Sequence, residues 1–238
     1  MKFKKKNYIK LLNEISKNDY IFILAKDCKK NFVKNKKIIL RHDIDFDTSF
    51  AVDMAKIEYD NQIKSTYFFL MRDVFYDLYS ENTFNDLMKI KQYGHEIGLH
   101  INPHNYLNKK NKLKLLKDDL NYFKKFYKIK LNSISFHQPS VYKFKDLDIK
   151  FKFSSYNKIL MKHFKYFSDS SMKFDYKGLK NFLATKHNIQ LLIHPIWWIT
   201  SKTTIHEKIK ETFIKKKSEL VNNFIKYDKL VKSKNTYG

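Results

Sequence analysis

The segment from Gly94 to His104, which reads GHEIGLHINPH, decides the fold of this chain. It begins with a glycine and a short apolar run, and it ends in two histidines four residues apart with Pro103 between them. A proline inside a helix removes a hydrogen bond and clashes with the preceding turn, so this pair is not expected on one helical face. We predict instead a strand from His95 to His100 that runs into a loop carrying His104.

Two neutral imidazoles that converge from a strand end and its loop suit a divalent metal of the zinc class. A catalytic site of this kind also needs a third protein ligand and an open position for water. A candidate ligand lies upstream in RHDID, residues 41–45, where an apolar strand ends in Asp43 and Asp45. Side chains two apart on a strand point to the same side, so both carboxylates can share one site.

Apolar strands alternate with amphipathic helices along the chain, which favours parallel strands joined by crossover helices. The predicted strands cover residues 36–42, 65–71, 95–100, 131–136, 164–168 and 189–193. Five strand ends deliver ionisable residues, namely Asp43 with Asp45, His100 with His104, His137, Asp169 and His194. Functional residues of (β/α) barrels lie at the carboxyl ends of the strands, so these side chains form the candidate site.

The composition fits one folded domain over residues 1–238, with its core at about 36–200 and a helical extension at about 203–231. The formal net charge is +24, but only two cations are arginine, the residue that reads phosphates and bases bidentately. We therefore expect no nucleic-acid partner. The single cysteine excludes an internal disulfide, and no apolar run is long enough for a membrane span or a signal peptide, which favours a cytoplasmic location.

These motifs resemble those of the polysaccharide deacetylases of the NodB-homology group, carbohydrate esterase family 4, and more closely their divergent HDVD-type relatives. The resemblance covers residues 38–198. It is carried by RHDID at 41–45, GHEIGLHINPH at 94–104, HQP at 137–139, Asp169, and LLIH at 191–194 with the following Trp197 and Trp198. It implies a distorted (β/α) barrel and metal-dependent hydrolysis of an N-acyl group on an amino sugar.

The resemblance also implies a role for each site residue. His100, His104 and one carboxylate of RHDID would hold the metal, with zinc as the first candidate. We assign Asp45 to the metal and Asp43 as general base, although the reverse assignment stays open. His194 would be the general acid and Asp169 the carboxylate that orients it. Candidate substrate-binding residues are His137, Trp197, Trp198 and Arg41.

The chain departs from the family at HQP, residues 137–139, which matches the family's third motif. In the family this motif carries an arginine that tethers the base, and this chain has His137 there instead. Arg41 and His137 are the two residues that can replace it. Structural roles are the competing interpretation for several positions: the carboxylates of RHDID can cap the following helix, Asp169 can form a turn, and the tryptophans can belong to the core. His42 and His95 alternate away from the site and are expected in packing.

The predicted activity is removal of an acetyl or formyl group from an amino sugar, nucleotide-linked or lipid-linked, in surface-glycan metabolism. Two alternatives remain: hydrolysis of a non-sugar amide or of a cyclic imide or ureide, and a degenerate barrel that binds glycans without catalysis. The sequence leaves the sugar, the acyl group, the metal and the oligomeric state open.

Overall fold

The computed structural model describes residues 2–31, 35–72, 74–107, 110–138, 151 and 153–234. Its centre is a sheet of parallel strands in the order β6-β5-β4-β3-β2-β8-β7, with β1 beside the start of β2. The strands are β1 (Ile21–Phe22), β2 (Lys37–Ile44), β3 (Thr66–Met71), β4 (Glu96–Ile101), β5 (Ser133–Phe136), β6 (Phe153–Ser154), β7 (Phe164–Ser168) and β8 (Asn188–Ile193). Within the described residues no pairing joins β6 to β7, so the predicted barrel is confirmed as a distorted, incompletely closed one.

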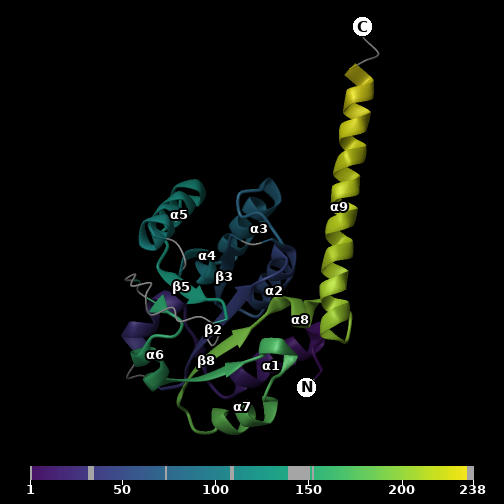
Figure 1. Cartoon of the computed structure of the whole chain (residues 1–238). Helices are drawn as coiled ribbons and strands as arrows, with labels where there is room; N and C mark the ends of the chain where they lie inside the picture. The colour runs from purple at the N-terminus through teal and green to yellow at the C-terminus, as the bar shows by residue number, and fades with distance from the viewer. Residues whose placement is uncertain are drawn as a thin grey trace.

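Helices surround the curled sheet, as Figure 1 shows. They are α1 (Lys5–Lys17), α2 (Thr48–Asp60), α3 (Glu81–Gln92), α4 (His104–Leu107), α5 (Lys112–Tyr127), α6 (Lys158–His163), α7 (Tyr176–Leu183), α8 (Pro195–Ile199) and α9 (Ile205–Lys234), with 3-10 turns η1 (Ala25–Asn31) and η3 (Ser170–Met172). No helix in the described part of the chain is both long enough and apolar enough to cross a bilayer.

Local sequence explains why the elements begin and end where they do. Asp47 caps α2 by accepting a hydrogen bond from the Ser49 backbone, and Gly94 ends the α3 region with a φ of +85°, which favours glycine. Strands β3, β4 and β8 are buried along their whole length, as expected for a parallel sheet covered on both faces. At Gly98 a Cβ would lie 2.6 Å from the ring of Phe68, so only glycine fits this strand position.

The six predicted strands are confirmed, each to within two residues at either end. The sequence patterns did not reveal β1, β6, α6 or α8, which are all six residues or shorter, because such elements carry too few residues for a period. Pro139, the last residue of the HQP motif, falls in the segment 139–150, outside the described residues. The predicted extension at 203–231 is the helix α9.

The order of the strands brings the candidate residues together. β2 lies between β3 and β8, and β4 and β5 follow on the β3 side. Because all these strands are parallel, their carboxyl ends meet at one edge of the sheet. This edge carries the side chains that follow β2, β4, β5 and β8.

Candidate metal centre

Three side chains at this edge of the sheet form a group with the composition of a metal site. They are Asp45, just after β2, His100 in β4 and His137, just after β5, and each offers one ligand atom. Asp45 Oδ1 lies 3.5 Å from His100 Nε2 and 3.6 Å from His137 Nδ1, and the two nitrogens are 3.1 Å apart. Asp45 Oδ1 is buried without a hydrogen-bond partner among the described residues.

The spacing of these three atoms fits a divalent cation. Ligands at about 2.0–2.1 Å from a tetrahedral zinc ion lie roughly 3.4 Å from one another. The observed distances of 3.1, 3.5 and 3.6 Å fall around this value. One carboxylate oxygen and two imidazole nitrogens are a donor set that suits such an ion, and a bound cation would replace the hydrogen bond between His100 Nε2 and His137 Nδ1. These three residues therefore fit the divalent cation that the sequence predicted, with His137 in the place expected for His104.

Ser135 in β5 fixes the tautomer of His100 that a metal requires. Its hydroxyl donates to Asp43 Oδ1 at 3.3 Å and lies 2.5 Å from His100 Nδ1. Since the serine proton is directed to Asp43, we infer that His100 Nδ1–H donates to the serine oxygen, which leaves the Nε2 lone pair for a metal. Burial lowers the pKa of His100 to about 4, so the imidazole is neutral at pH 7.

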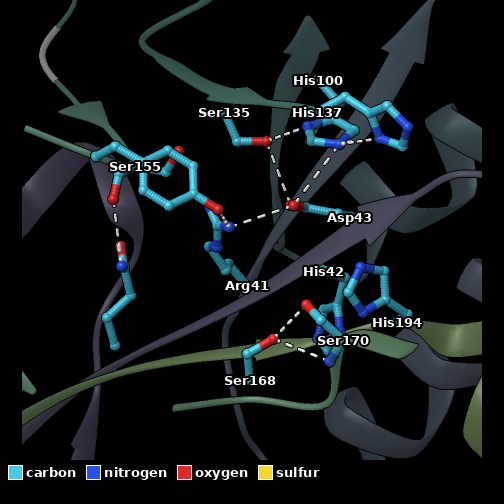
Figure 2. Close-up of polar contacts among 12 residues, drawn as sticks. Arg41, His42, Asp43, His100, Ser135, His137, Ser155, Ser168, Ser170 and His194 are labelled. Atoms are coloured by element: carbon cyan, nitrogen blue, oxygen red, sulfur yellow. Dashed lines mark hydrogen bonds and ion pairs between the residues drawn. The ribbon is translucent and has the colours of Figure 1, made fainter. Parts of the chain in front are cut away.

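Asp43 lies beside the metal group and is held by an internal ion pair. Figure 2 shows its carboxylate between Arg41 on one side and Ser135 and His100 on the other. Arg41 Nη2 lies 3.2 Å from Asp43 Oδ2 and 3.3 Å from the Tyr156 hydroxyl. Both members of the pair are almost wholly buried. Arg41 and Asp43 are two apart in β2, so both point into the barrel.

The position of Arg41 inside the barrel differs from the predicted role of this residue in substrate binding. No surface of the Arg41 side chain is exposed, and its guanidinium lies over the rings of Phe68 and Tyr156. A residue that is sealed into the barrel cannot reach a substrate, but it can hold Asp43. Arg41 is thus the cation beside the candidate base, and it comes from β2 itself rather than from the loop after β5.

His194 and Asp169 form a second pair at the same edge. His194 Nδ1 lies 2.6 Å from Asp169 Oδ1, and the His194 backbone N–H also donates to this carboxylate. Asp169 is fully buried, whereas His194 keeps 12% of its side chain exposed, and its Nε2 lies 3.8 Å from Asp45 Oδ2. With Nδ1 engaged by Asp169, Nε2 faces the metal group and can exchange a proton there.

The charges of the site set the protonation of its members. Burial alone would lower the pKa of His194, but the Asp169 carboxylate, helped by Asp45 and Asp43, outweighs burial and raises it to about 9. Burial alone would likewise raise the pKa of Asp45, yet His137, His100 and His194 hold it well below its usual range. At neutral pH, without a bound cation, the site therefore holds an imidazolium and an ionised carboxylate.

The structure places His104, one of the predicted ligands, outside the metal group. His104 begins α4 and is exposed, and it is not in the group that Asp45, His100 and His137 form in the described residues. Its place follows from Asn102, whose side chain accepts a hydrogen bond from the His104 backbone and turns the chain there. His104 was predicted as a ligand, and His137 was not, because the GHEIGLHINPH run that resembles the family motif ends in His104.

The tryptophans have structural surroundings. Trp198 is fully buried and its indole Nε1–H donates to Asp169 at 2.7 Å, so it orients this carboxylate and is not available to stack on a sugar. Trp197 is nearly buried, and its ring centroid lies 6.3 Å from that of His194. Burial of aromatic side chains in the core, the alternative interpretation, explains both positions.

One polar cluster on the other face of β2 was not predicted. Its centre is Glu58 in α2, a fully buried carboxylate that lies 2.7 Å from His42 Nε2 and accepts hydrogen bonds from Tyr67, Ser65 and Tyr8. His42 Nδ1 is 3.1 Å from the Ile193 carbonyl, the residue before His194. The expectation that His42 and His95 lie away from the site is consistent with this cluster, but Glu58 looks from the sequence like an ordinary helix surface residue.

Known proteins resemble this chain in three-dimensional structure but not in sequence. No family model matches the chain, and no curated protein matches it in sequence. Solved structures do match: a family 4 carbohydrate esterase from Bacillus anthracis (15% identity, 86% of each chain, TM-score 0.44) and the peptidoglycan deacetylase PdaC from Bacillus subtilis (15%, 80% of this chain and 97% of that one, 0.45). A third is BA3943 from Bacillus anthracis, a CE4 family pseudoenzyme (12%, 79% and 62%, 0.40).

Proposed function

We propose that the protein is a metal-dependent hydrolase that removes an acetyl or formyl group from the nitrogen of an amino sugar or sugar precursor. The observation that carries this proposal is the convergence of Asp45, His100 and His137 at tetrahedral spacing, with Asp43 on one side and His194 on the other. Zinc is the first candidate for the cation because imidazole and carboxylate ligands suit it.

Each residue then has a chemical task. When bound, the cation would polarise the amide carbonyl and acidify a water molecule. Asp43, held in place by Arg41, accepts the proton of the attacking water. His194, charged and aimed by Asp169, donates a proton to the departing amine. One base and one acid on opposite sides of the metal group are what amide hydrolysis requires.

The exposure of the site residues supports entry of a substrate from one side. The side chains of Asp45, His137 and His194 keep 15, 21 and 12% of their surface exposed, while Asp43 and His100 keep 3% or less. The open side of the site is therefore the His137–His194 side, and the base lies behind the metal group. We place His137 as the third ligand, with His104 as the alternative that the family motif implies.

The proposal includes a cytoplasmic location for the protein and a sugar linked to a nucleotide or a lipid. A substrate made in the cytoplasm, nucleotide-linked or lipid-linked, is consistent with the basic surface of a chain with a net charge of +24. A degenerate barrel that only binds glycans is the second candidate, because the third-motif arginine is replaced and BA3943, a solved structure that matches, is a pseudoenzyme.

The deciding experiment measures acetate and formate release from N-acyl amino sugars by protein loaded with one equivalent of zinc. Asp43→Asn should bind zinc as wild type does and release no product, since only the base is removed. Product release by Asp43→Asn at the wild-type rate would remove Asp43 as base. Failure of zinc-loaded wild type on every amino-sugar substrate, with retained glycan binding, would favour the non-catalytic alternative.

A matched pair of variants identifies the third ligand. His137→Ala should lower zinc affinity by at least 100-fold, because it removes one of three ligands, whereas His104→Ala should leave the affinity unchanged. Metal content after dialysis measures both without reference to activity. The reverse result would return the third position to His104 and leave the hydrolase proposal intact.

A further inference from the structure

The helix α9 lies on the body only through its first part. Lys208 and Thr212 are buried there, and Lys215 reaches Asp47 at the start of α2. Lys216 lies over the Tyr76 ring, and α9 lines a cavity with the α2–α3 region as far as Asn223; the C-terminal end of the helix then stands clear of the barrel, as the yellow end of the chain shows in Figure 1. From Ile214 onward the described part of α9 carries eight large apolar side chains that are 39–70% exposed, namely Ile214, Leu220, Val221, Phe224, Ile225, Tyr227, Leu230 and Val231.

Six of these residues form one continuous face, and Tyr227 and Leu230 lie outside it. At about 100° per residue, all six lie within an arc of about 140°. The centre line of that arc passes between Lys217 and Asp228, the charged residues closest to the middle of the face. Lys208 and Thr212, which bury against the body, lie on the opposite side of the helix. The middle of the apolar face therefore points away from its own barrel and is open to a second molecule, whereas Leu220 at its edge lines the cavity beside the α2–α3 region.

The pattern on this face is symmetric about its midpoint, which lies between Asn222 and Asn223. Positions at equal distance from the midpoint are both apolar: 214 with 231, 220 with 225, and 221 with 224. The two central charges also lie at equal distances, and they are opposite in sign, Lys217 and Asp228. A two-fold axis through the midpoint would place each apolar residue against an apolar residue and each charge against its opposite.

We propose that a second copy of this chain docks antiparallel on this face, so that α9 is the dimerisation element of the protein. The contact spans residues 214–231, about 27 Å of helix, and is self-complementary as a two-fold interface must be. Burial of the apolar face stabilises the pair, and Lys217 against Asp228 of the other copy selects its direction and register.

The two central charges, Lys217 and Asp228, favour an antiparallel second copy over a parallel copy or a membrane surface. Parallel pairing of two copies would place Lys217 opposite Lys217 and Asp228 opposite Asp228, and like charges in contact oppose association. A membrane surface would have to take up Asp228 in the middle of the inserted face, where ionised carboxylates are unfavourable. Within its own helix Asp228 pairs with Lys232 at 2.7 Å, and the antiparallel arrangement adds Lys217 of the other copy while keeping like charges apart.

The test exchanges the charges at Lys217 and Asp228 and measures the oligomeric state by sedimentation velocity. The full chain is used at about 1–100 µM, because the dissociation constants of many dimers are on the order of these concentrations. Wild type should be a dimer. Lys217→Asp and Asp228→Lys should each weaken the dimer by about tenfold or more, because each places like charges together. The double variant Lys217→Asp with Asp228→Lys should restore it. Circular dichroism and zinc content, which these substitutions leave unchanged, show that the variants are folded.

Three results would overturn the proposal. A wild-type monomer across the whole range would exclude the dimer. Single exchanges without effect, or a double variant no better than either single one, would exclude the antiparallel register. Sedimentation of monomers with vesicles of phosphatidylglycerol, abolished by Phe224→Glu, would assign the face to a membrane instead. None of these readouts depends on hydrolase activity.

Discussion

Glu58 offers the sharpest test of how buried charge stabilises this barrel. Its carboxylate is fully buried in α2, beside His42 and under the hydroxyls of Tyr8, Tyr67 and Ser65. Burial alone would raise the pKa of Glu58, but His42, with smaller contributions from His95 and Ser65, lowers it from 4.5 to about 2. The folded chain thus holds this carboxylate ionised where an unfolded chain would begin to protonate it.

The lowered pKa of Glu58 sets the size and the pH dependence of its contribution to the free energy of unfolding. A difference of about 2.5 pKa units corresponds to roughly 3 kcal/mol of stability at pH 7, at about 1.4 kcal/mol per unit. Because the folded pKa is the lower one, this stability is fully present above pH 4.5 and is lost as the pH falls toward 2. By pH 3 about half of it should remain. Glu58→Gln should therefore lower the unfolding free energy by about 3 kcal/mol at pH 7 and by much less at pH 3.

The assay is urea unfolding of metal-free wild type and Glu58→Gln at pH 7, 5, 4 and 3, followed by circular dichroism. Removal of metal beforehand keeps the candidate metal centre out of the comparison. Glu219→Gln, at an exposed position of α9, is the matched control and should change stability by less than about 0.5 kcal/mol at every pH. A difference between wild type and Glu58→Gln that stays constant from pH 7 to pH 3 would refute the low folded pKa.

Three further predictions concern single contacts. Gly98→Ala places a methyl group 2.6 Å from a buried aromatic ring of β3 and should lower the unfolding free energy by about 1–3 kcal/mol, measured by urea unfolding. Arg41→Met leaves Asp43 buried without its cation; we expect a loss of about 3–5 kcal/mol and a turnover defect in kcat rather than KM. Trp198→Phe removes the indole donor to Asp169, which should destabilise the protein by about 1.5–3 kcal/mol and lower kcat, and unchanged values would show that this donor is dispensable.

The fold was accessible from sequence because its signals are local. Apolar runs that fill whole strands, and helices with one apolar stripe, follow from neighbours in the chain, so the six main strands and the barrel class could be predicted. The strand-end carboxylates and imidazoles were equally visible, since parallel strands deliver their carboxyl ends to one edge. Elements such as β6 and α8 were missed because they are too short for a period to show.

Only the tertiary structure decided which side chains of the candidate site contact one another. Sequence spacing favoured His104 as the third ligand, yet the strand order β4-β5 brings His137 to within 3.1 Å of His100. The cation beside Asp43 is Arg41, a contact that depends on the barrel interior sealing both side chains from water. Distances between side chains far apart in the chain depend on register and burial, and no local pattern carries that information.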